Sequence, residues 1–207
     1  MVTLALVLAG SYLLGSIPFG YLAGRIAGID IRRAGSGNVG ATNVVRVIGK
    51  PYGYTVFALD FLKGFAAVKV STMLAKSAPP DWGSREIFEI VAAVSSILGH
   101  SYPPWLKFKG GKGVATSGGA LFALMPVAGL VGLAVWILIF WLTRYVSVAS
   151  VTAAVVLPIV ILLISCGTES AIPIFYFSVC VAAVVIWRHR SNISRLKRGT
   201  EPRFTRK

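Results

Sequence analysis

Seven apolar segments, separated by short polar stretches, make up most of this chain. They cover residues 2–24, 54–75, 87–99, 114–125, 127–143, 147–164 and 172–187. A helix that crosses a bilayer needs about 20 apolar residues. A chain of 207 residues that is 56% hydrophobic cannot bury so much apolar surface in one soluble core. The sequence therefore predicts an all-α integral membrane protein, with seven transmembrane helices in a single domain over residues 1–207.

Two of these segments, 87–99 and 114–125, are shorter than a perpendicular span. Either they are half-spans beside polar loops that dip into the protein, or their boundaries lie several residues further out. Non-helical backbone survives at membrane depth only where protein or water covers it. Short helices next to glycine-rich loops therefore indicate an indentation.

The basic residues are distributed very unevenly between the two ends of these segments. If the N-terminus lies outside, 17 of the 21 Lys and Arg residues fall in the inside stretches 25–53, 100–113, 144–146 and 188–207. The positive-inside rule then predicts an outside N-terminus and a cytoplasmic C-terminus. No soluble basic domain carries the net charge of +14, so we expect contacts with membrane lipids and no nucleic-acid binding.

Cysteine and histidine give no sign of a metal centre or a disulfide framework. Cys166 and Cys180 are the only cysteines, and the two histidines have no obvious acidic or thiol companions. We therefore expect neither a metal nor a cofactor. The first apolar segment lacks a basic flank and a convincing cleavage site, so it is interpreted as a retained span.

The first inside stretch contains a glycine-rich run over residues 35–43. Its sequence is Gly35-Ser36-Gly37-Asn38-Val39-Gly40-Ala41-Thr42-Asn43. Glycines at this spacing can turn successive backbone N–H groups toward one anion, and a helix starting near Ala41 would add partial positive charge. A flexible surface loop is the alternative. The bracketing residues Arg32, Arg33 and Arg46 favour a phosphate site.

A second glycine run, Gly110-Gly111-Lys112-Gly113, follows Lys107 and Lys109. It is not a Walker A loop, because glycine rather than Ser or Thr follows Lys112. It still places a flexible cation among glycines at the start of a helix, which suits a phosphoryl oxygen. Interfacial lysines that extend toward water would explain Lys107 and Lys109, but they would not explain the glycines.

Two polar groups lie on the predicted helices themselves. Asp60 and Lys63 are one turn apart in the second segment, where they form either a structural ion pair or part of a site. Ser147 and Ser150 share one face at the inner end of the sixth segment. Serines in membrane helices often bond to their own backbone, so a ligand contact is the less favoured interpretation.

A third polar group follows the last apolar segment. If the helix continues there, His189 and Asn192 lie on one face, with Arg195 a turn beyond. A basic tail usually serves orientation and lipid contact. This stripe of histidine, asparagine and arginine is more specific than that.

At these residues the chain resembles the bacterial PlsY family, the acyl-phosphate:glycerol-3-phosphate acyltransferases. The matching strings are 35–43, 60–64, 99–100, 108–116, 144–147, 188–193 with Arg195, and 199–201. The resemblance implies an enzyme that moves a fatty acyl group from acyl phosphate to the sn-1 hydroxyl of glycerol-3-phosphate. The products are lysophosphatidic acid and inorganic phosphate, in the first acylation of phospholipid synthesis. It also implies a multi-pass protein of the bacterial inner membrane, expected to be monomeric, with its active site facing the cytoplasm.

The resemblance also implies a set of site residues. The expected catalytic group is Lys112, Arg46, Ser36, His189 and Asn192. The expected substrate-binding group is Gly37, Asn38, Gly40, Thr42, Asn43, Gly110, Gly111, Gly113, Ser147, Ser150 and Arg195, with the choice between the two serines left open. Asp60 and Lys63 match a family string but are interpreted as structural.

The chemistry of an acyl phosphate limits what such an enzyme must do. The leaving group is already good, so the main tasks are to align hydroxyl and carbonyl and to stabilise developing charge. No Ser-His-Asp set is evident, and Cys166 and Cys180 are expected outside or in mid-membrane, so no covalent acyl-enzyme is expected. The His-x4-Asp pattern of other acyltransferases is also absent, because Trp105 and Ser194 stand five residues after His100 and His189. The base is either the substrate phosphate or His189. The alternative function is a small transporter of phosphorylated solutes, although no internal repeat supports it.

Overall fold

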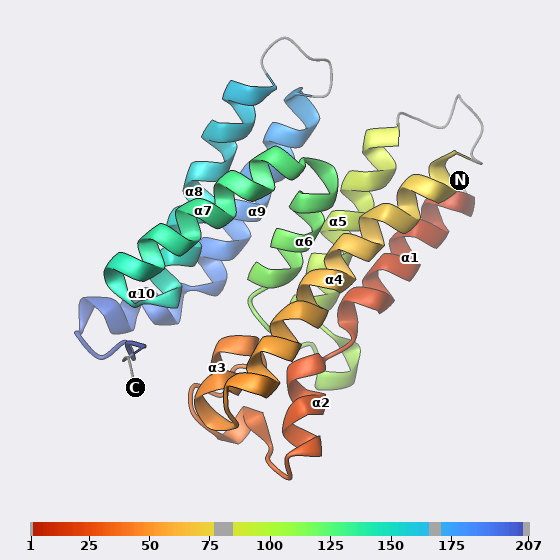
Figure 1. The fold of residues 1–207 in the computed structure, drawn as a ribbon. Coiled ribbons are helices and arrows are strands. Elements are labelled where there is room, and N and C mark those ends of the chain that lie inside the picture. Colours follow the sequence, from red (N-terminus) through yellow and green to blue (C-terminus); the bar gives the residue numbers. More distant parts are fainter. Residues whose placement is uncertain (1, 77–84, 166–170, 205–207) are drawn as a thin grey trace. The chain divides into compact units, whose positions relative to one another are not determined.

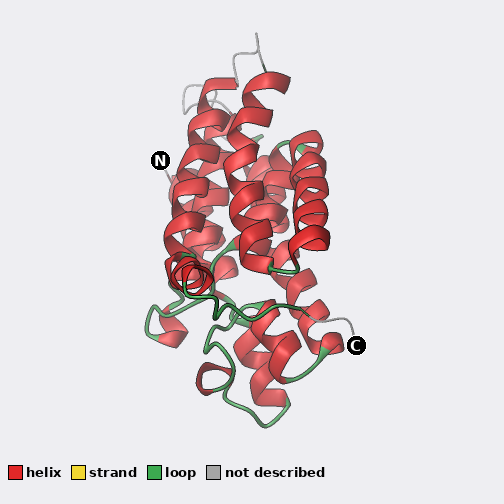
Figure 2. Ribbon diagram, turned by 90° about the vertical axis from the view of Figure 1, so that its left-hand side faces the viewer, coloured by secondary structure: helices red, strands yellow, loops and turns green. Residues whose placement is uncertain are grey.

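The computed structural model describes residues 2–76, 85–165 and 171–204, and every regular element in these ranges is a helix (Figures 1 and 2). The helices are α1 (Val2–Ser16), α2 (Phe19–Ile26), η1 (Ile31–Arg33), α3 (Ala41–Val47), α4 (Lys50–Ala75), α5 (Arg85–Ser101), η3 (Pro104–Leu106), α6 (Val114–Leu124), α7 (Pro126–Thr143), α8 (Val146–Ile164), α9 (Ala171–Arg188) and α10 (Arg190–Lys197). The prediction of an all-α chain is confirmed. The chain forms two compact units, residues 1–124 and 125–207. Cys166 lies outside the described residues, and Cys180 is exposed.

Each predicted apolar segment is helical at its expected place, but the first is broken. Helix α1 ends at Ser16 and α2 begins at Phe19, because Pro18 has no backbone N–H to continue the helix. Among the described residues, 2–26, 126–143 and 146–164 are long and apolar enough to cross a bilayer. The pair α9–α10, bent by 54°, would add a fourth. The count of seven spans stays a prediction.

Helix α5 shows which explanation of the short segments applies to residues 87–99. This helix extends from Arg85 to Ser101 and has 17 residues, so the expected boundaries were too narrow. Helix α6 stays short, with 11 residues between the second glycine run and Met125. The stretch before α6 is therefore a loop that leads directly into a half-length helix.

The helices of unit 1 approach each other closely at glycines. Helix α4 packs along α6, and a Cβ atom on Gly64 would collide with the carbonyl oxygen of Thr116. Helix α1 packs along α5, where a Cβ on Gly15 would collide with the backbone of Ser96. Small residues at such crossings are typical of helices packed in membranes, where backbone contact replaces a hydrophobic driving force.

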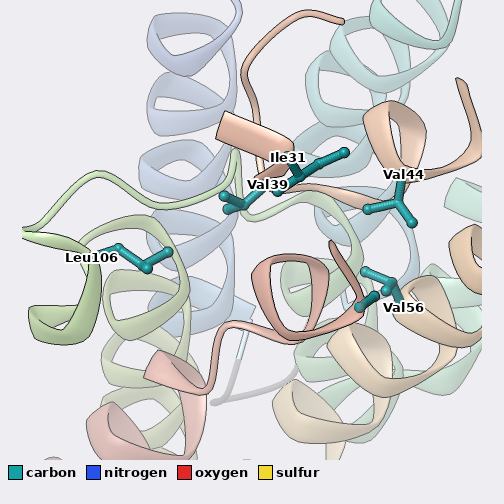
Figure 3. Packing of buried hydrophobic residues seen from close by; sticks show 6 residues of the cluster. Ile31, Val39, Val44, Val56 and Leu106 are labelled. Carbon is teal, nitrogen blue, oxygen red and sulfur yellow. The ribbon is translucent and has the colours of Figure 1, made fainter. Parts of the chain in front are cut away.

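The end of unit 1 away from the N-terminus carries α2, α3 and the stretch 102–113 (Figure 1). A small apolar core joins these elements to α4, and Figure 3 shows its labelled members. The buried members are Ala23, Ile31, Val39, Val44, Val56 and Leu106. Ile31 precedes the first glycine run, Val39 lies within it and Val44 follows it, so this core holds the loop on both sides.

Unit 2 is built from α7, α8 and α9, packed in chain order, followed by α10 and a short tail. Arg144 adopts a left-handed conformation with φ 62° and reverses the chain between α7 and α8. The tail returns to this turn, since the N–H of Phe204 donates to the Arg144 carbonyl at 3.0 Å. This return brings Glu201 back to the start of α8.

Candidate functional site

The first glycine loop is held from within by one buried side chain, Asn43, in the first turn of α3. Its Oδ1 accepts the N–H of Ser36 at 2.9 Å. Its Nδ2 donates to the carbonyls of Ala34 at 3.0 Å and Asn38 at 2.9 Å, with the Ile31 carbonyl at 3.3 Å. Asn43 is 2% exposed. An amide that meets the backbone at several points holds the loop in one shape, so the flexible-loop alternative does not describe it.

The predicted cradle of successive backbone N–H groups is wrong for three of its members. The N–H of Ser36 bonds to Asn43, that of Gly37 to the Ala34 carbonyl at 3.0 Å, and that of Gly40 to Asn38 Oδ1 at 2.8 Å. Because these donors are used inside the loop, a phosphate there would have to meet side chains and the remaining N–H groups. Helix α3 does begin at Ala41, as expected.

The residues of this loop differ in exposure. Ser36 is exposed, whereas Gly37, Asn38 and Gly40 are half-buried. Thr42 and Arg46 are half-buried on α3. All of these residues belong to one short stretch of the chain at this end of unit 1.

Of the arginines that bracket the loop, Arg32 is engaged by an acid. Its Nε and Nη2 donate to the carboxylate of Asp30 at 2.9 and 2.7 Å. These bonds lower the pKa of Asp30 to about 2. Arg33 contacts the same carboxylate more weakly, with 4.0 Å between its Nε and Asp30 Oδ2, and its side chain is exposed to solvent. A dianion at this loop would therefore have to compete with Asp30 for Arg32.

The second glycine loop is anchored to the end of α5. The N–H of Gly110 donates to the Ser101 carbonyl and that of Gly111 to the His100 carbonyl, both at 3.1 Å. Lys112 is half-buried, and Gly113 has φ 80°, a left-handed conformation that favours glycine. Helix α6 starts directly afterwards.

The two loops meet the same buried polar cluster. Asp60 and Lys63 form an ion pair with 2.8 Å between Oδ1 and Nζ, and His100 Nδ1 lies 3.4 Å from the same carboxylate oxygen. These residues line a small cavity together with Val39 of the first loop and Pro103 at the base of the second. The structural ion pair expected from the spacing of Asp60 and Lys63 is present. Both loops therefore lie at the same end of unit 1.

Unit 2 contains a second polar cluster, centred on a carboxylate that had no predicted role. Glu201 Oε1 accepts from Ser147 Oγ at 2.9 Å and from Asn192 Nδ2 at 2.6 Å, and Oε2 accepts from Arg195 Nε at 2.8 Å. Burial would raise the pKa of Glu201, but these hydrogen bonds outweigh it and hold the pKa below its usual range. Ser150 Oγ instead accepts from Trp136 Nε1 at 3.1 Å.

His189 lies at the bend between α9 and α10 and is 2% exposed. Its Nδ1 is 2.8 Å from the carbonyl oxygen of Val185. Since a carbonyl can only accept, Nδ1 is the donor in this contact and carries a proton. No group of three or more histidine, cysteine or acidic side chains suited to a metal ion occurs within the ranges that the structure describes.

Comparison with known proteins identifies the family of this chain. The family model described as "Glycerol-3-phosphate acyltransferase" matches residues 5–199. A glycerol-3-phosphate acyltransferase of Prochlorococcus marinus (strain NATL2A) is 45% identical over 200 residues, covering 96% of this chain and 97% of the relative. One of Aquifex aeolicus (strain VF5) is 43% identical over 194 residues, covering 94% and 95%.

The fold is similar to solved structures of PlsY (YgiH), an integral membrane glycerol 3-phosphate acyltransferase. Its glycerol 3-phosphate form superposes with a TM-score of 0.85 at 42% identity, covering 98% of this chain and 96% of that one. Its lysophosphatidic acid form gives a TM-score of 0.82 at 42% identity, covering 98% and 95%.

Proposed function

Because the chain belongs to the glycerol-3-phosphate acyltransferase family, we propose that it transfers a fatty acyl group from acyl phosphate to the sn-1 hydroxyl of glycerol-3-phosphate. The products are lysophosphatidic acid and inorganic phosphate. One observation supports this proposal within the molecule: two glycine loops, each followed by or bearing a basic residue, lie at the same end of unit 1. The relative solved in glycerol 3-phosphate and lysophosphatidic acid forms shares 42% of its residues with this chain.

In the proposed reaction the sn-1 oxygen attacks the acyl carbonyl carbon, an ester bond forms, and the bond from that carbon to the phosphate oxygen breaks. Charge develops on the carbonyl oxygen and on the departing phosphate, and Lys112 and Arg46 are suited to stabilise it. Ser36 and Thr42, with Asn38, offer side chains to phosphate oxygens. Since its amide is occupied by the loop, Asn43 supports the site by holding the loop's shape.

The other site residues expected from the sequence, His189, Asn192, Arg195 and one of two serines, belong to unit 2. His189, whose Nδ1 is held by the Val185 carbonyl, is the protein group proposed to take the hydroxyl proton. The departing phosphate could take the same proton instead. Of the two serines, Ser147 is favoured over Ser150 because it shares Glu201 with Asn192 and Arg195.

We further propose that the protein is a monomeric, multi-pass protein of the bacterial inner membrane, with seven spans in one domain and its active site facing the cytoplasm. Helices at all seven apolar segments support the span count. The charge asymmetry supports an outside N-terminus and a cytoplasmic C-terminus. Membrane lipids would surround the spans and supply the setting for an acyl phosphate donor.

The test is a phosphate-release assay on purified protein in lipid, with acyl phosphate and glycerol-3-phosphate as substrates. We expect release to require both substrates. Lys112→Ala should lower turnover by at least about 10²-fold, the scale of losing one charge-stabilising donor. Lys76→Ala, an exposed lysine at the far end of α4, is the matched control and should retain turnover.

Two outcomes would contradict the proposal in different ways. Near-normal turnover of a folded Lys112→Ala protein would remove this lysine from the site. Uptake of glycerol-3-phosphate into vesicles without any phosphate release would replace the enzyme by a transporter.

A further inference from the structure

The buried cluster of Asp60, Lys63 and His100 has no part in the chemistry proposed above. Its side chains are 3%, 2% and 7% exposed, and both Lys63 and His100 contact the same carboxylate oxygen. Lys63 Nζ also donates to the carbonyl of Ile17 at 2.9 Å, within the break between α1 and α2. Removing one member of a buried charged pair leaves the other without compensation, which strongly destabilises the fold. The cluster therefore ties α4 and α5 to the break.

The imidazole of His100 forms the surface against which the second glycine loop rests. A Cβ atom on Gly111 would collide with Nε2 of this ring, and the three nearest heavy atoms to that Cβ all belong to the ring. Gly111 does not have a positive φ, so its backbone would accept a side chain. The glycine is therefore required by the position of the ring, and the ring is oriented by its contact with Asp60.

The residue after Gly111 is Lys112, the main cation of the proposed site. We infer that the pair of Asp60 and His100 positions Lys112: the carboxylate orients the ring, the ring supports Gly111, and this contact fixes where the lysine leaves the loop. The inference rests on the proposed function and extends it to two residues that act through another. His100 and Asp60 are thus positioning residues, and Lys63 balances the charge of Asp60.

A positioning role has a kinetic signature. Lys112 is proposed to stabilise charge that develops in the transition state, so loosening its support should lower kcat with little change in KM. A displacement of about 1 Å at a reacting centre can lower the rate by about 10²-fold. General destabilisation of the fold would instead lower the active fraction and the melting temperature together.

The test uses Gly111→Ala, which adds one methyl group against the ring. We expect kcat for phosphate release to fall by about 10²-fold, while KM for both substrates stays within about threefold. Gly118→Ala is the matched control on α6, because the nearest atoms to its Cβ are ring carbons of Phe61 at 3.8 and 3.9 Å. This control should keep both constants.

A double variant tests whether Gly111 acts through His100. His100→Ala should lower kcat, and adding Gly111→Ala should lower it no further, because the obstructing ring is gone and the two changes affect one contact. If the two losses multiply instead, the residues act independently and the inference is overturned. It is also overturned if Gly111→Ala has normal kcat, or if only KM changes.

Two checks separate this inference from other failures. A wild-type protein that releases no phosphate refutes the proposed function, whereas an active wild type with unaffected variants refutes only the positioning role. If Gly111→Ala does not fold, His100→Asn replaces it. Its amide nitrogen can take the place of Nδ1 beside Asp60 but leaves the space beside Gly111 empty, so we expect a native melting temperature with reduced kcat. Full activity of this variant would overturn the inference.

Discussion

The hydrogen bonds of Asn43 predict how much the first glycine loop depends on one side chain. Asn43→Ala removes the acceptor for the Ser36 N–H at 2.9 Å and the donors to the carbonyls of Ala34 at 3.0 Å and Asn38 at 2.9 Å. The bond to the Ile31 carbonyl, at 3.3 Å, is the longest of the four. An amide nitrogen has only two protons, so this bond to the Ile31 carbonyl adds little to the other two bonds of Nδ2.

The free-energy cost of Asn43→Ala is worked out from the three shorter hydrogen bonds. Each intramolecular hydrogen bond contributes about 1 kcal/mol net, so the ordered loop should lose about 3 kcal/mol relative to opened conformations. A difference of about 1.4 kcal/mol corresponds to a factor of ten, and the opened population should therefore rise by roughly 10²-fold. The cost falls on the loop and α3, because the core residues that flank the loop are left in place.

Hydrogen exchange measures this directly, since the Ser36 N–H bonds to no other group than Asn43 among its described contacts. We expect exchange across residues 34–40 to accelerate toward that roughly 10²-fold limit in Asn43→Ala. Asn43→Asp keeps the acceptor for Ser36 but sets a carboxylate against carbonyl oxygens. It should therefore protect the loop from exchange no better than Asn43→Ala does. Thr55→Ala, which removes an exposed bond to the Pro51 carbonyl, is the control and should exchange like the wild type.

The reasoning fails if the folded Asn43→Ala protein exchanges at the wild-type rate in this loop. It also fails if Asn43→Asp is fully protected, because the two donors would then contribute nothing.

Two further predictions concern stability. Glu201 has a lower pKa in the folded than in the unfolded chain, so its contribution is present above the ordinary value of 4.5 and is lost as pH falls through the folded value. Glu201→Gln should therefore melt below the wild type at pH 7, and the two melting curves should converge in acid; a constant difference down to pH 3 would contradict this. Gly64→Ala should destabilise unit 1 by about 1–3 kcal/mol, as overpacking does, because its Cβ meets the Thr116 carbonyl. Gly10→Ala, with open space around its Cβ, should melt like the wild type, and equal melting of both variants would refute the close crossing of α4 and α6.

The helical content could be predicted from hydropathy, but helix ends could not. Apolar runs mark the part of a helix that avoids water, whereas ends depend on capping and on proline. Helix α4 starts at Lys50, before the predicted segment 54–75, with Pro51 in its first turn. The break at Pro18 was hidden because apolar residues continue on both sides of it.

The types of residue in the candidate site could also be predicted, but several roles could not. The glycine spacing suggested a cradle of N–H groups, yet Asn43 and Asn38 take two of those donors. Which acceptor each backbone N–H meets depends on how α3 packs against the loop. The spacing of glycines in the sequence carries no information about that packing. Glu201 gave no local signal, since its partner Ser147 is 54 residues away in the chain. Its place in the matching string 199–201 marked the residue but not its role.

The glycines of the two loops are therefore explained first by protein contacts rather than by a ligand. A Cβ on Gly35 would collide with Asn43 Oδ1, and one on Gly111 would collide with the ring of His100. In both loops a buried polar side chain takes the space that a glycine leaves, and it thereby fixes the backbone before any substrate arrives. An activated acyl donor needs alignment more than it needs a strong nucleophile, and fixed loops supply alignment. Alanine at either glycine consequently tests the shape of the loop, whereas alanine at Lys112 tests the charge that the loop presents.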